Sequence, residues 1–458
     1  MNIDQSIFKS YDIRGVYPQQ LNEETASQIA QTFLKILSGK FNKPIKELKI
    51  AVGQDIRESS ASLIRSAIDI FLEYGAAVDD LGLISINDLY FAVGYYKYDG
   101  GVMATASHNP PEYGGFKMVK LNQNHTDSIE FLYGKLLYEE LVKLNLPLKD
   151  EKIKGQFKKK DIIQDHLNHI LSFVDLQKIK PFKIAVDTGN GMMGLLIPRL
   201  LEKMKVTLIP LFIEPDGKFP NRPPNPLEPG TSKKISQKIK QEKADFGVMY
   251  DADGDRMFLV DEKGDLIRGD MILLLMAKAM LEKNPGAGIV YNLICSHAVP
   301  ELVNKWGGRA IRSEVGYRNL ADHMRNEGGE MSGEVSGHFA FKKNYYADNG
   351  FIALALSLQT ISEDGRKLSQ IIKDYCLYAR GDEINIKVES IPSKLDLIRK
   401  YYQKNIKDEI DGITVEFAEW WFNIRASNTE PLLRITVEAK NQKELKKRQE
   451  EVLKIIQR

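Results

Sequence analysis

Residues 104–117 read Ala-Thr-Ala-Ser-His-Asn-Pro-Pro-Glu-Tyr-Gly-Gly-Phe-Lys, an apolar run that gives way to turn-forming residues. The prolines and glycines prevent a helix or a central strand from continuing through the segment. The pattern predicts that Ser107 lies at the exposed end of a strand. Its hydroxyl, followed by His108, Asn109 and Lys117, can accept a bulky charged group such as a phosphoryl. A plain turn is the alternative, because Ser, Asn and Pro are common turn residues.

Length and charge limit the possible classes of protein. A chain of 458 residues is too long for one core, so three or four domains are expected. The hydrophobic fraction of 43% and the charged fraction of 28% are those of an ordinary soluble globular protein. A net charge of +2 gives no overall field for nucleic acid or an anionic membrane, so we expect neither partner. Any anion must be bound by a local site.

Local features of the sequence also favour a soluble globular protein that binds neither nucleic acid nor a membrane. The run Lys158-Lys159-Lys160 predicts the solvated start of a helix rather than a nucleic-acid site. Cys295 and Cys376 match neither a disulfide framework nor a zinc pattern. The N-terminus lacks a basic region followed by an apolar core, and the most apolar segments are too short to span a bilayer. We therefore expect a cytoplasmic protein.

Apolar runs and amphipathic stretches alternate in three rounds, each of which predicts strand, helix, strand, helix, strand. Such alternation implies largely parallel sheets covered by helices. Residues 129–144 have a helix pattern that gives way to a polar stretch, and residues 213–230 hold six prolines and predict an irregular surface loop. The expected strands are 48–53, 76–81 and 101–106, then 182–187, 206–212 and 245–250, then 288–293, 309–313 and the run into 333–338; the expected helices include 63–72, 191–203, 235–242, 298–306 and 319–325.

Each round ends its last strand on a polar cluster, at residues 105–109, 251–256 and 334–338. Ligands of parallel sheets gather at the carboxyl ends of strands, so these clusters predict one site. The rest of the chain has alternating runs and a final helix from Gln442, and it predicts a smaller α+β domain.

The second cluster predicts a metal site. Asp251, Asp253 and Asp255 would face one side if the segment is extended, and their carboxylates repel unless a cation joins them. Mg²⁺ fits, because it accepts a few carboxylates and leaves room for a phosphate oxygen. An EF-hand is excluded by Arg256 at the sixth position, which requires glycine, and by strand-like flanks. A solvated acidic turn is the alternative. Arg256 would supply a fixed positive charge beside the metal.

Three further segments could bind a phosphorylated sugar. Arg14, beside Gly15, can reach a ligand without a bulky neighbour. The alternating side chains of Glu334, Ser336 and His338 suit vicinal hydroxyls if that segment is extended. The loop from Arg425 to Pro431 suits a dianionic phosphate, with a polar hairpin loop as the alternative; its donors are Arg425, Ser427, Asn428 and Thr429.

Four motifs, at residues 105–110, 251–256, 334–338 and 425–431, together and in this order resemble the α-D-phosphohexomutase superfamily, and most of all bacterial phosphomannomutase/phosphoglucomutase. The resemblance covers essentially the whole chain. It implies three topologically similar mixed α/β domains (1–152, 153–263 and 264–374) and a C-terminal α+β domain (375–458) of the TATA-box-binding type, around a central cleft. It also implies a hexose phosphate substrate and a monomer or weak dimer.

The resemblance assigns roles to the candidate residues. Ser107 would be the phosphoserine and, with the three aspartates, would hold one Mg²⁺. Hexose 1,6-bisphosphate would be the intermediate and activator. Glu334 and Ser336 would bind the sugar hydroxyls, and the loop at Arg425 would bind the phosphate that does not react. The positions near the reacting phosphate are Tyr11, Arg14, His108, Lys117, Arg256 and His338, of which Arg14, Lys117 and His338 are candidates for the general base.

Two departures from the family pattern limit the prediction of specificity. Val315-Gly316-Tyr317-Arg318 stands where bifunctional relatives often have Thr-Gly-His-Ser, and Ile294-Cys295-Ser296 stands where they have a Lys-Cys-Thr segment. Arg318 or Lys342 could supply the missing contacts. Asn428 favours the phosphomannomutase/phosphoglucomutase branch over phosphoglucosamine mutase, which remains an alternative, as does a phosphosugar-binding homologue without turnover.

Overall fold

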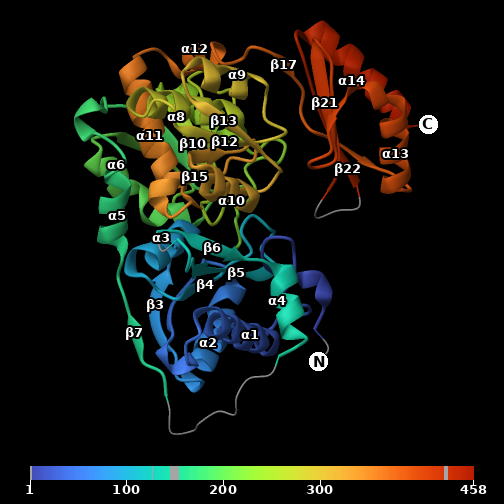
Figure 1. Ribbon diagram of the computed structural model, residues 1–458. Helices are drawn as coiled ribbons and strands as arrows, with labels where there is room; N and C mark the ends of the chain where they lie inside the picture. Colours follow the sequence, from blue (N-terminus) through green and yellow to red (C-terminus); the bar gives the residue numbers. More distant parts are fainter. Residues whose placement is uncertain (1–2, 126, 145–153, 428–431, 458) are drawn as a thin grey trace.

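The computed structural model describes residues 3–125, 127–144, 154–427 and 432–457. Four sheets, each with its own helices, define four domains along the chain (Figure 1). Domain 1 lies at one end of the molecule, domains 2 and 3 pack together above it, and domain 4 lies to one side of domain 3. The predicted fold class of three α/β domains and a C-terminal α+β domain is confirmed.

The strand order of domain 1 is β1-β5-β4-β2-β3-β7, and β6 pairs with β5. Strands β2, β3, β4 and β7 are parallel to their neighbours in that set, and β1, β5 and β6 are antiparallel. Ile50 and Val52 pack in the core with α1 and α2, whereas Ala51 packs with α3, because alternate residues of a strand face opposite sides. The bounds are β1 Ile13–Val16, α1 Glu23–Phe41, β2 Lys49–Gln54, α2 Glu58–Glu73, β3 Ala77–Leu83, α3 Ile86–Tyr96, β4 Gly100–Ala104, β5 Tyr113–Leu121, β6 Ile129–Leu132, α4 Gly134–Leu141 and β7 Phe157–Lys159.

Domain 2 has the strand order β11-β10-β8-β9, in which only β11 is antiparallel to its neighbour. Residues 213–230, all described, form no helix or strand, as predicted. The helix predicted at 191–203 divides into a short 3-10 turn and the α-helix α6, in whose first turn Pro198 is the second residue. The bounds are α5 Ile163–Leu171, β8 Lys183–Asp187, α6 Ile197–Lys203, β9 Thr207–Leu211, α7 Lys233–Glu242, β10 Phe246–Tyr250 and β11 Met257–Val260.

Domain 3 has the strand order β13-β12-β14-β15-β16 and shares one large apolar core with domain 2. Helices α8 and α11 supply much of this core, since they are buried on nearly all sides. The shared core explains why the two domains pack as one body in Figure 1. The bounds are α8 Gly269–Lys283, β12 Gly288–Asn292, α9 Ala298–Lys305, β13 Arg309–Ser313, α10 Tyr317–Glu327, β14 Gly329–Gly333, β15 Phe339–Phe341, β16 Ala347–Asp348, α11 Gly350–Asp364 and α12 Leu368–Lys373.

Domain 4 is an antiparallel sheet in the order β17-β22-β21-β20-β19, with β18 also paired to β22. Helices α13 and α14 pack with the strands around a separate core. Its alternating strands and final helix match the predicted α+β pattern. The bounds are β17 Ala379–Arg380, β18 Ile384–Lys387, α13 Ile391–Tyr401, β19 Ile406–Asp408, β20 Ile413–Glu416, β21 Trp420–Ala426, β22 Leu432–Ala439 and α14 Gln442–Ile456.

Two local predictions are wrong. Residues 129–144 were expected to be helical, but the segment starts as strand β6 and becomes helical only at Gly134. Lys158 and Lys159 were expected at a helix start, but they lie in β7, which pairs with β3 at the edge of sheet 1. In both cases hydrogen bonding to a neighbouring strand overrides the local pattern.

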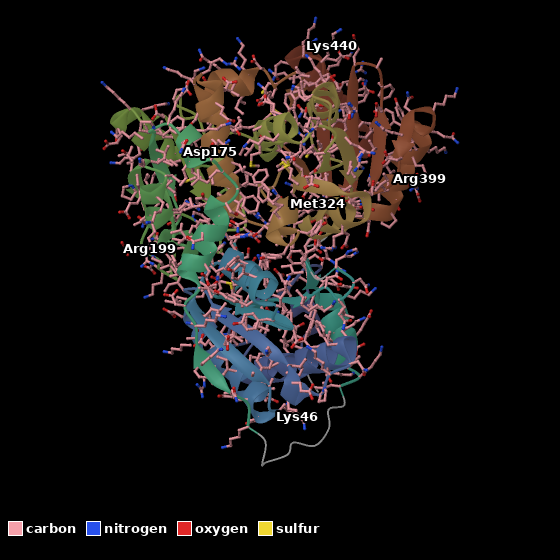
Figure 2. The ribbon with its side chains drawn as sticks, turned by 60° about the vertical axis from the view of Figure 1, so that its left-hand side comes forward. Lys46, Asp175, Arg199, Met324, Arg399 and Lys440 are labelled. Atoms are coloured by element: carbon pink, nitrogen blue, oxygen red, sulfur yellow. The ribbon has the colours of Figure 1, made fainter. Side chains whose placement is uncertain are left out.

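Figure 2 shows the side chains on these domains, with Lys46 marking the lower end of domain 1 and Lys440 the upper end of the molecule. Within the described ranges, no helix combines the length and apolar character needed to cross a membrane. The domain boundaries expected after residues 152, 263 and 374 stay predictions.

Candidate active site

The three polar clusters predicted at strand ends meet where domains 1, 2 and 3 come together. The loop after β4 carries Ser107, whose Oγ donates a 2.9 Å hydrogen bond to Asp253 Oδ1 in the turn between β10 and β11. The β10–β11 turn also pairs with the turn between β14 and β15, through an isolated antiparallel bridge between Arg256 and His338. Met257 N donates to Gly337 O at 2.9 Å in the same bridge. One site therefore receives side chains from three domains.

Ser107 is buried, so the prediction of an exposed strand end is wrong. Strand β4 stops at Ala104, and Ser107 follows in a left-handed conformation with a φ of 51° and a relative exposure of 2%. The N–H of Ser107 donates to Thr105 Oγ1 at 2.9 Å, and this hydrogen bond stabilises the left-handed backbone conformation. The hydroxyl is covered because the aspartate turn of domain 2 lies against it.

Arg57 organises the Ser107 loop, and the sequence analysis missed it. This buried guanidinium donates to the carbonyls of Ser107, Asn109 and Pro110, each at 2.6 Å, and pairs with Asp55. One rigid fork thereby fixes three carbonyl groups of the loop. The available signal was an aspartate directly after strand β2 with an arginine two residues further on, a position where parallel sheets gather functional side chains.

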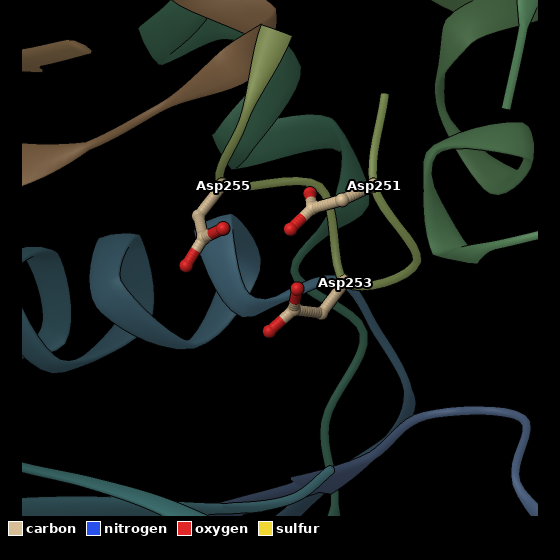
Figure 3. A group of neighbouring side chains, drawn as sticks. All are labelled: Asp251, Asp253 and Asp255. Atoms are coloured by element: carbon tan, nitrogen blue, oxygen red, sulfur yellow. The ribbon is translucent and has the colours of Figure 1, made fainter. Parts of the chain in front are cut away.

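The aspartate turn brings three carboxylates together (Figure 3). Ligand oxygens of Asp251, Asp253 and Asp255 lie within 4.8 Å of one another, and all three side chains are buried. The prediction that this segment is extended, with the three aspartates facing one side, is wrong. The segment is a tight turn in which Gly254 has a φ of 85°, and Asp251 Oδ1 accepts from the N–H groups of Gly254 and Arg256 at 3.1 Å.

The chemistry of this turn fits a cation. Each aspartate keeps one buried oxygen that forms no hydrogen bond among the described residues, namely Asp251 Oδ2, Asp253 Oδ2 and Asp255 Oδ1. Within that part of the chain these oxygens have only ion-pair contacts with nearby cationic side chains, at 2.7–3.7 Å. Burial, and then the charges of Asp255 and Asp253, raises the pKa of Asp251 well above its usual value. Clustered carboxylates that remain charged require positive charge nearby, so these residues could hold a metal ion.

Lys117 supplies part of that positive charge from domain 1. It lies on β5, next to β4, and its Nζ is 2.7 Å from Asp253 Oδ2 and 2.5 Å from Asp255 Oδ2. Burial alone would lower the pKa of Lys117, but the two carboxylates outweigh burial and raise it well above its ordinary value. The pKa of Asp255 is correspondingly well below its usual range, because Lys117 and His338 outweigh the effect of burial.

Glu334, Ser336 and His338 lie together, although the segment is a turn and not the extended run that was expected. Ser336 Oγ donates to Glu334 Oε1 at 2.6 Å and lies 2.8 Å from His338 Nδ1. Asn292, at the end of β12, donates to Glu334 Oε2 at 2.9 Å. Asn292 was also missed, and only its place at a strand end could have indicated it.

His338 links this turn to the aspartates. Its Nδ1 lies 2.9 Å from Glu334 Oε1 and its Nε2 lies 3.5 Å from Asp255 Oδ1. Burial disfavours the imidazolium, but Asp255 and Glu334 together raise the pKa of His338 to about 10. Burial would raise the pKa of Glu334, yet His338 and its other hydrogen-bond partners lower it to about 2. The pair is therefore charged at neutral pH.

The remaining N-terminal candidates border the same loops. Arg14 forms hydrogen bonds to Asp12 and donates to Asn109 Oδ1 at 2.6 Å, so it supports the Ser107 loop. Tyr11 donates to Val315 O at 3.3 Å, across the boundary between domains 1 and 3. His108 Nδ1 lies 3.3 Å from Ser107 Oγ, and burial, followed by nearby arginines, lowers the pKa of His108 well below its usual value.

The candidate phosphate loop lies on domain 4, where β21 ends. Arg425 is buried and pairs through Nη2 with Glu383 at 2.8 Å, while its Nε has no hydrogen bond to the described residues. Ser427 N donates to Leu432 O at 2.9 Å. Asn428 and Thr429 lie outside the described residues.

The two residues suggested as replacements for missing family contacts are engaged elsewhere. The Arg318 guanidinium lies 3.7 Å from the centre of the Tyr133 ring. Lys342 Nζ forms a 2.6 Å ion pair with Glu330. These contacts do not support the substitution hypothesis.

Comparison with known proteins identifies the family. The chain matches phosphoglucomutase/phosphomannomutase alpha/beta/alpha domains I, II and III at residues 5–135, 164–264 and 268–378, and the C-terminal domain at 383–455. It is 35% identical to a phosphomannomutase of Methanocaldococcus jannaschii, over 99% of this chain and 98% of the relative. It is 33% identical to a phosphomannomutase/phosphoglucomutase of Pseudomonas aeruginosa, over 96% and 93%.

A solved structure agrees. A phosphoglucomutase/phosphomannomutase family protein of Burkholderia thailandensis has a TM-score of 0.87 and 28% identity, over 100% of this chain and 98% of that one. The chain therefore belongs to the phosphoglucomutase/phosphomannomutase family and is a phosphohexomutase, an isomerase that moves a phosphoryl group on a hexose phosphate. The resemblance read from the sequence is confirmed.

Proposed function

We propose that this phosphohexomutase interconverts the 1- and 6-phosphates of mannose, glucose or both, through phosphorylated Ser107 and a hexose 1,6-bisphosphate. One observation carries the proposal: the buried Ser107 Oγ lies 2.9 Å from Asp253 Oδ1, within a cluster of three carboxylates. A hydroxyl held beside a potential cation site is suited to accept and return a phosphoryl group.

The proposed chemistry has two mirrored halves. The bond between Ser107 Oγ and phosphorus breaks as the free hydroxyl of the hexose phosphate bonds to phosphorus, and the hydroxyl proton passes to a base. The bisphosphate then turns around, and its other phosphoryl group returns to Ser107. Lys117 and His338 both contact Asp255 and are the candidates for proton transfer. Despite burial, the neighbouring carboxylates raise the pKa of both groups, so either would have to give up a proton, for example to the leaving Ser107 Oγ, before it could take the proton of the sugar hydroxyl. The guanidinium of Arg14 stays protonated and is suited to bind phosphate instead.

We propose Mg²⁺ as the cation, held by Asp251, Asp253 and Asp255 and by the oxygen or phosphate of Ser107. The hard oxygen donors of these side chains, and one buried oxygen on each aspartate that has no hydrogen bond to the described residues, support this choice. Bound Mg²⁺ would offset negative charge on the transferring phosphoryl group. Arg256, whose Nε lies 3.7 Å from Asp251 Oδ2, would add a fixed positive charge.

Other residues would orient the sugar. Glu334 and Ser336 offer an acceptor and a hydroxyl for sugar hydroxyls. On domain 4, the buried Nε of Arg425 lacks a hydrogen bond to the described residues, which suits binding of the phosphate that does not react. Ser427, Asn428 and Thr429 would complete that binding, and Tyr11 and His108 would border the reacting phosphate. A cleft between the four domains, a monomer or weak dimer and a cytoplasmic location are further parts of the proposal.

Substrate preference is tested by comparing kcat/KM for mannose, glucose and glucosamine 1-phosphates. We expect mannose or glucose 1-phosphate to be preferred, because the relatives named above are phosphomannomutases or phosphoglucomutases. A preference for glucosamine 1-phosphate would favour the alternative of a phosphoglucosamine mutase. Binding of all three without turnover would favour a catalytically silent homologue.

A further inference from the structure

The start of helix α3 in domain 1 holds the aspartate turn of domain 2. Ile86 N, the first N–H of the helix, donates to Asp253 O at 3.1 Å. The next side chain, Asn87, donates through Nδ2 to Gly254 O at 2.8 Å. The first N–H groups of a helix have no partner within it, so here one of them is used between domains. Both carbonyls of the turn's centre are thus fixed from outside domain 2.

Asn87 also contacts domain 3. Its Oδ1 accepts from Gly350 N, the first residue of α11, at 3.3 Å, and its side chain is fully buried. The carbonyl of Gly254 would lie 2.7 Å from a Cβ at Gly350, so no larger residue fits there without a shift. A single amide therefore joins three domains directly behind the three carboxylates.

A second series of side-chain hydrogen bonds lies beside Asn87. It links the start of α3 to the start of α11. Asp88 accepts from Ser85 N at 2.8 Å and pairs with His166 Nδ1 at 2.6 Å. His166 Nε2 lies 3.2 Å from Asn349 Nδ2, and Asn349 Oδ1 caps α11. Because the Asn349 amide must donate, Nε2 of His166 accepts and Nδ1 carries the proton toward Asp88. Neither α3 nor α11 can shift without breaking this series of hydrogen bonds.

We infer that Asn87 is a positioning residue for the aspartate turn. Through Gly254 and Asp253 it would set the position of the three carboxylates relative to the proposed nucleophile, Ser107. The hydrogen bond to Gly254 O fixes the peptide that joins the second and third aspartates. Asp253 accepts from Ser107 Oγ, so a rotation of this peptide changes the distance between serine and carboxylates. The inference rests on the proposed role of the aspartates as metal ligands. Partners that orient metal ligands commonly change metal affinity by about 10–100-fold when removed.

The test compares Asn87→Leu, similar in size but unable to hydrogen bond, with Asn344→Leu. Asn344 is a matched control, because it is equally buried and is also hydrogen-bonded. Its partners are Ala347 O and His169 Nε2, neither of which belongs to the aspartate turn. The readouts are the Kd of Mn²⁺, measured by electron paramagnetic resonance on the purified protein, the Mg²⁺ concentration for half activation, kcat, KM and the melting temperature.

We expect Asn87→Leu to weaken Mn²⁺ binding about tenfold or more and to lower kcat, with little change in KM for the hexose phosphate. Asn344→Leu should lower the melting temperature while Mn²⁺ affinity stays at the wild-type value. Unchanged Mn²⁺ affinity and kcat in Asn87→Leu would overturn the inference, as would equal losses in both variants. If Asn87→Leu does not fold, Asn87→Ser, too short to bridge both partners, should give the same pattern. Failure of the proposed function would look different, since the wild-type protein itself would lack Mn²⁺ binding and turnover.

Discussion

Ser107 Oγ and Asp253 Oδ1 lie 2.9 Å apart, although they are 146 positions apart in the chain and belong to different domains. Lys117 repeats the connection, since it lies in domain 1 and pairs with Asp253 and Asp255 of domain 2. The packing of the two domains therefore determines the geometry around the serine. Any change that shifts one domain against the other should affect activity before it affects the fold of either domain.

Ser107→Ala should abolish mutase turnover while hexose phosphate still binds. The substitution removes one hydroxyl and its hydrogen bonds, but it leaves the aspartates and the Arg57 contacts in place. Activity assays and calorimetric binding of glucose 1-phosphate measure the two effects. Ser357→Ala, at a fully buried serine that bonds Ala353 O, is the matched control and should remain active. Turnover by Ser107→Ala at the wild-type rate would remove Ser107 from its proposed role.

Arg57→Lys should damage both stability and activity. An ammonium cannot reproduce the fork that holds Ser107, Asn109 and Pro110, so buried carbonyls lose their donors. We expect a loss of about 2–4 kcal/mol in the free energy of unfolding and a fall in kcat of at least about tenfold. Urea unfolding and steady-state kinetics measure these changes. Arg65→Lys, at a largely exposed pair with Asp69, should change neither appreciably. Wild-type kcat in Arg57→Lys would contradict the positioning role.

Asp251→Asn should separate repulsion between carboxylates from metal binding. Without Mg²⁺ the variant should melt at or above the wild-type temperature, because it lacks a carboxyl group whose ionisation is opposed by burial and by the two neighbouring carboxylates. With Mg²⁺ the wild type should gain stability and the variant should gain much less. Thermal unfolding with and without Mg²⁺ measures both changes, and Asp69→Asn is a surface control. Equal gains in the wild type and Asp251→Asn would argue against metal binding at this turn.

Acid should destabilise the protein partly through His169. Burial lowers the pKa of His169 from 6.5 to about 4, so between these values the unfolded chain binds a proton that the folded chain does not. Stability should therefore fall as the pH falls from 6.5 to 4, by at most about 1.4 kcal/mol per pH unit for this group. His169→Gln can keep the bond to Asn344 without titrating. Its urea-unfolding free energy should depend less on pH across this range, and an unchanged slope would show that His169 contributes nothing.

Part of this architecture could be predicted from the sequence. The alternation of apolar and amphipathic runs predicted the strands that lead into Ser107, Asp251 and Glu334, because periodicity and strand ends are local properties. The burial of Ser107 and the turn geometry of the aspartates could not be predicted, since both depend on packing between domains. Arg57 and Asn87 act on carbonyl groups of distant loops. The position of Arg57 after a strand could mark it as a candidate, but no local pattern identifies the loop that either residue binds.

Phosphorylation of Ser107 is tested most directly by intact-mass analysis of the protein after incubation with glucose 1,6-bisphosphate, followed by peptide mapping. We expect a mass gain of one phosphoryl group located on Ser107, absent in Ser107→Ala and removed again when excess hexose monophosphate is added. A protein that shows no mass gain while it turns over substrate, or that carries the phosphoryl group on another residue, would rule out the proposed role of Ser107.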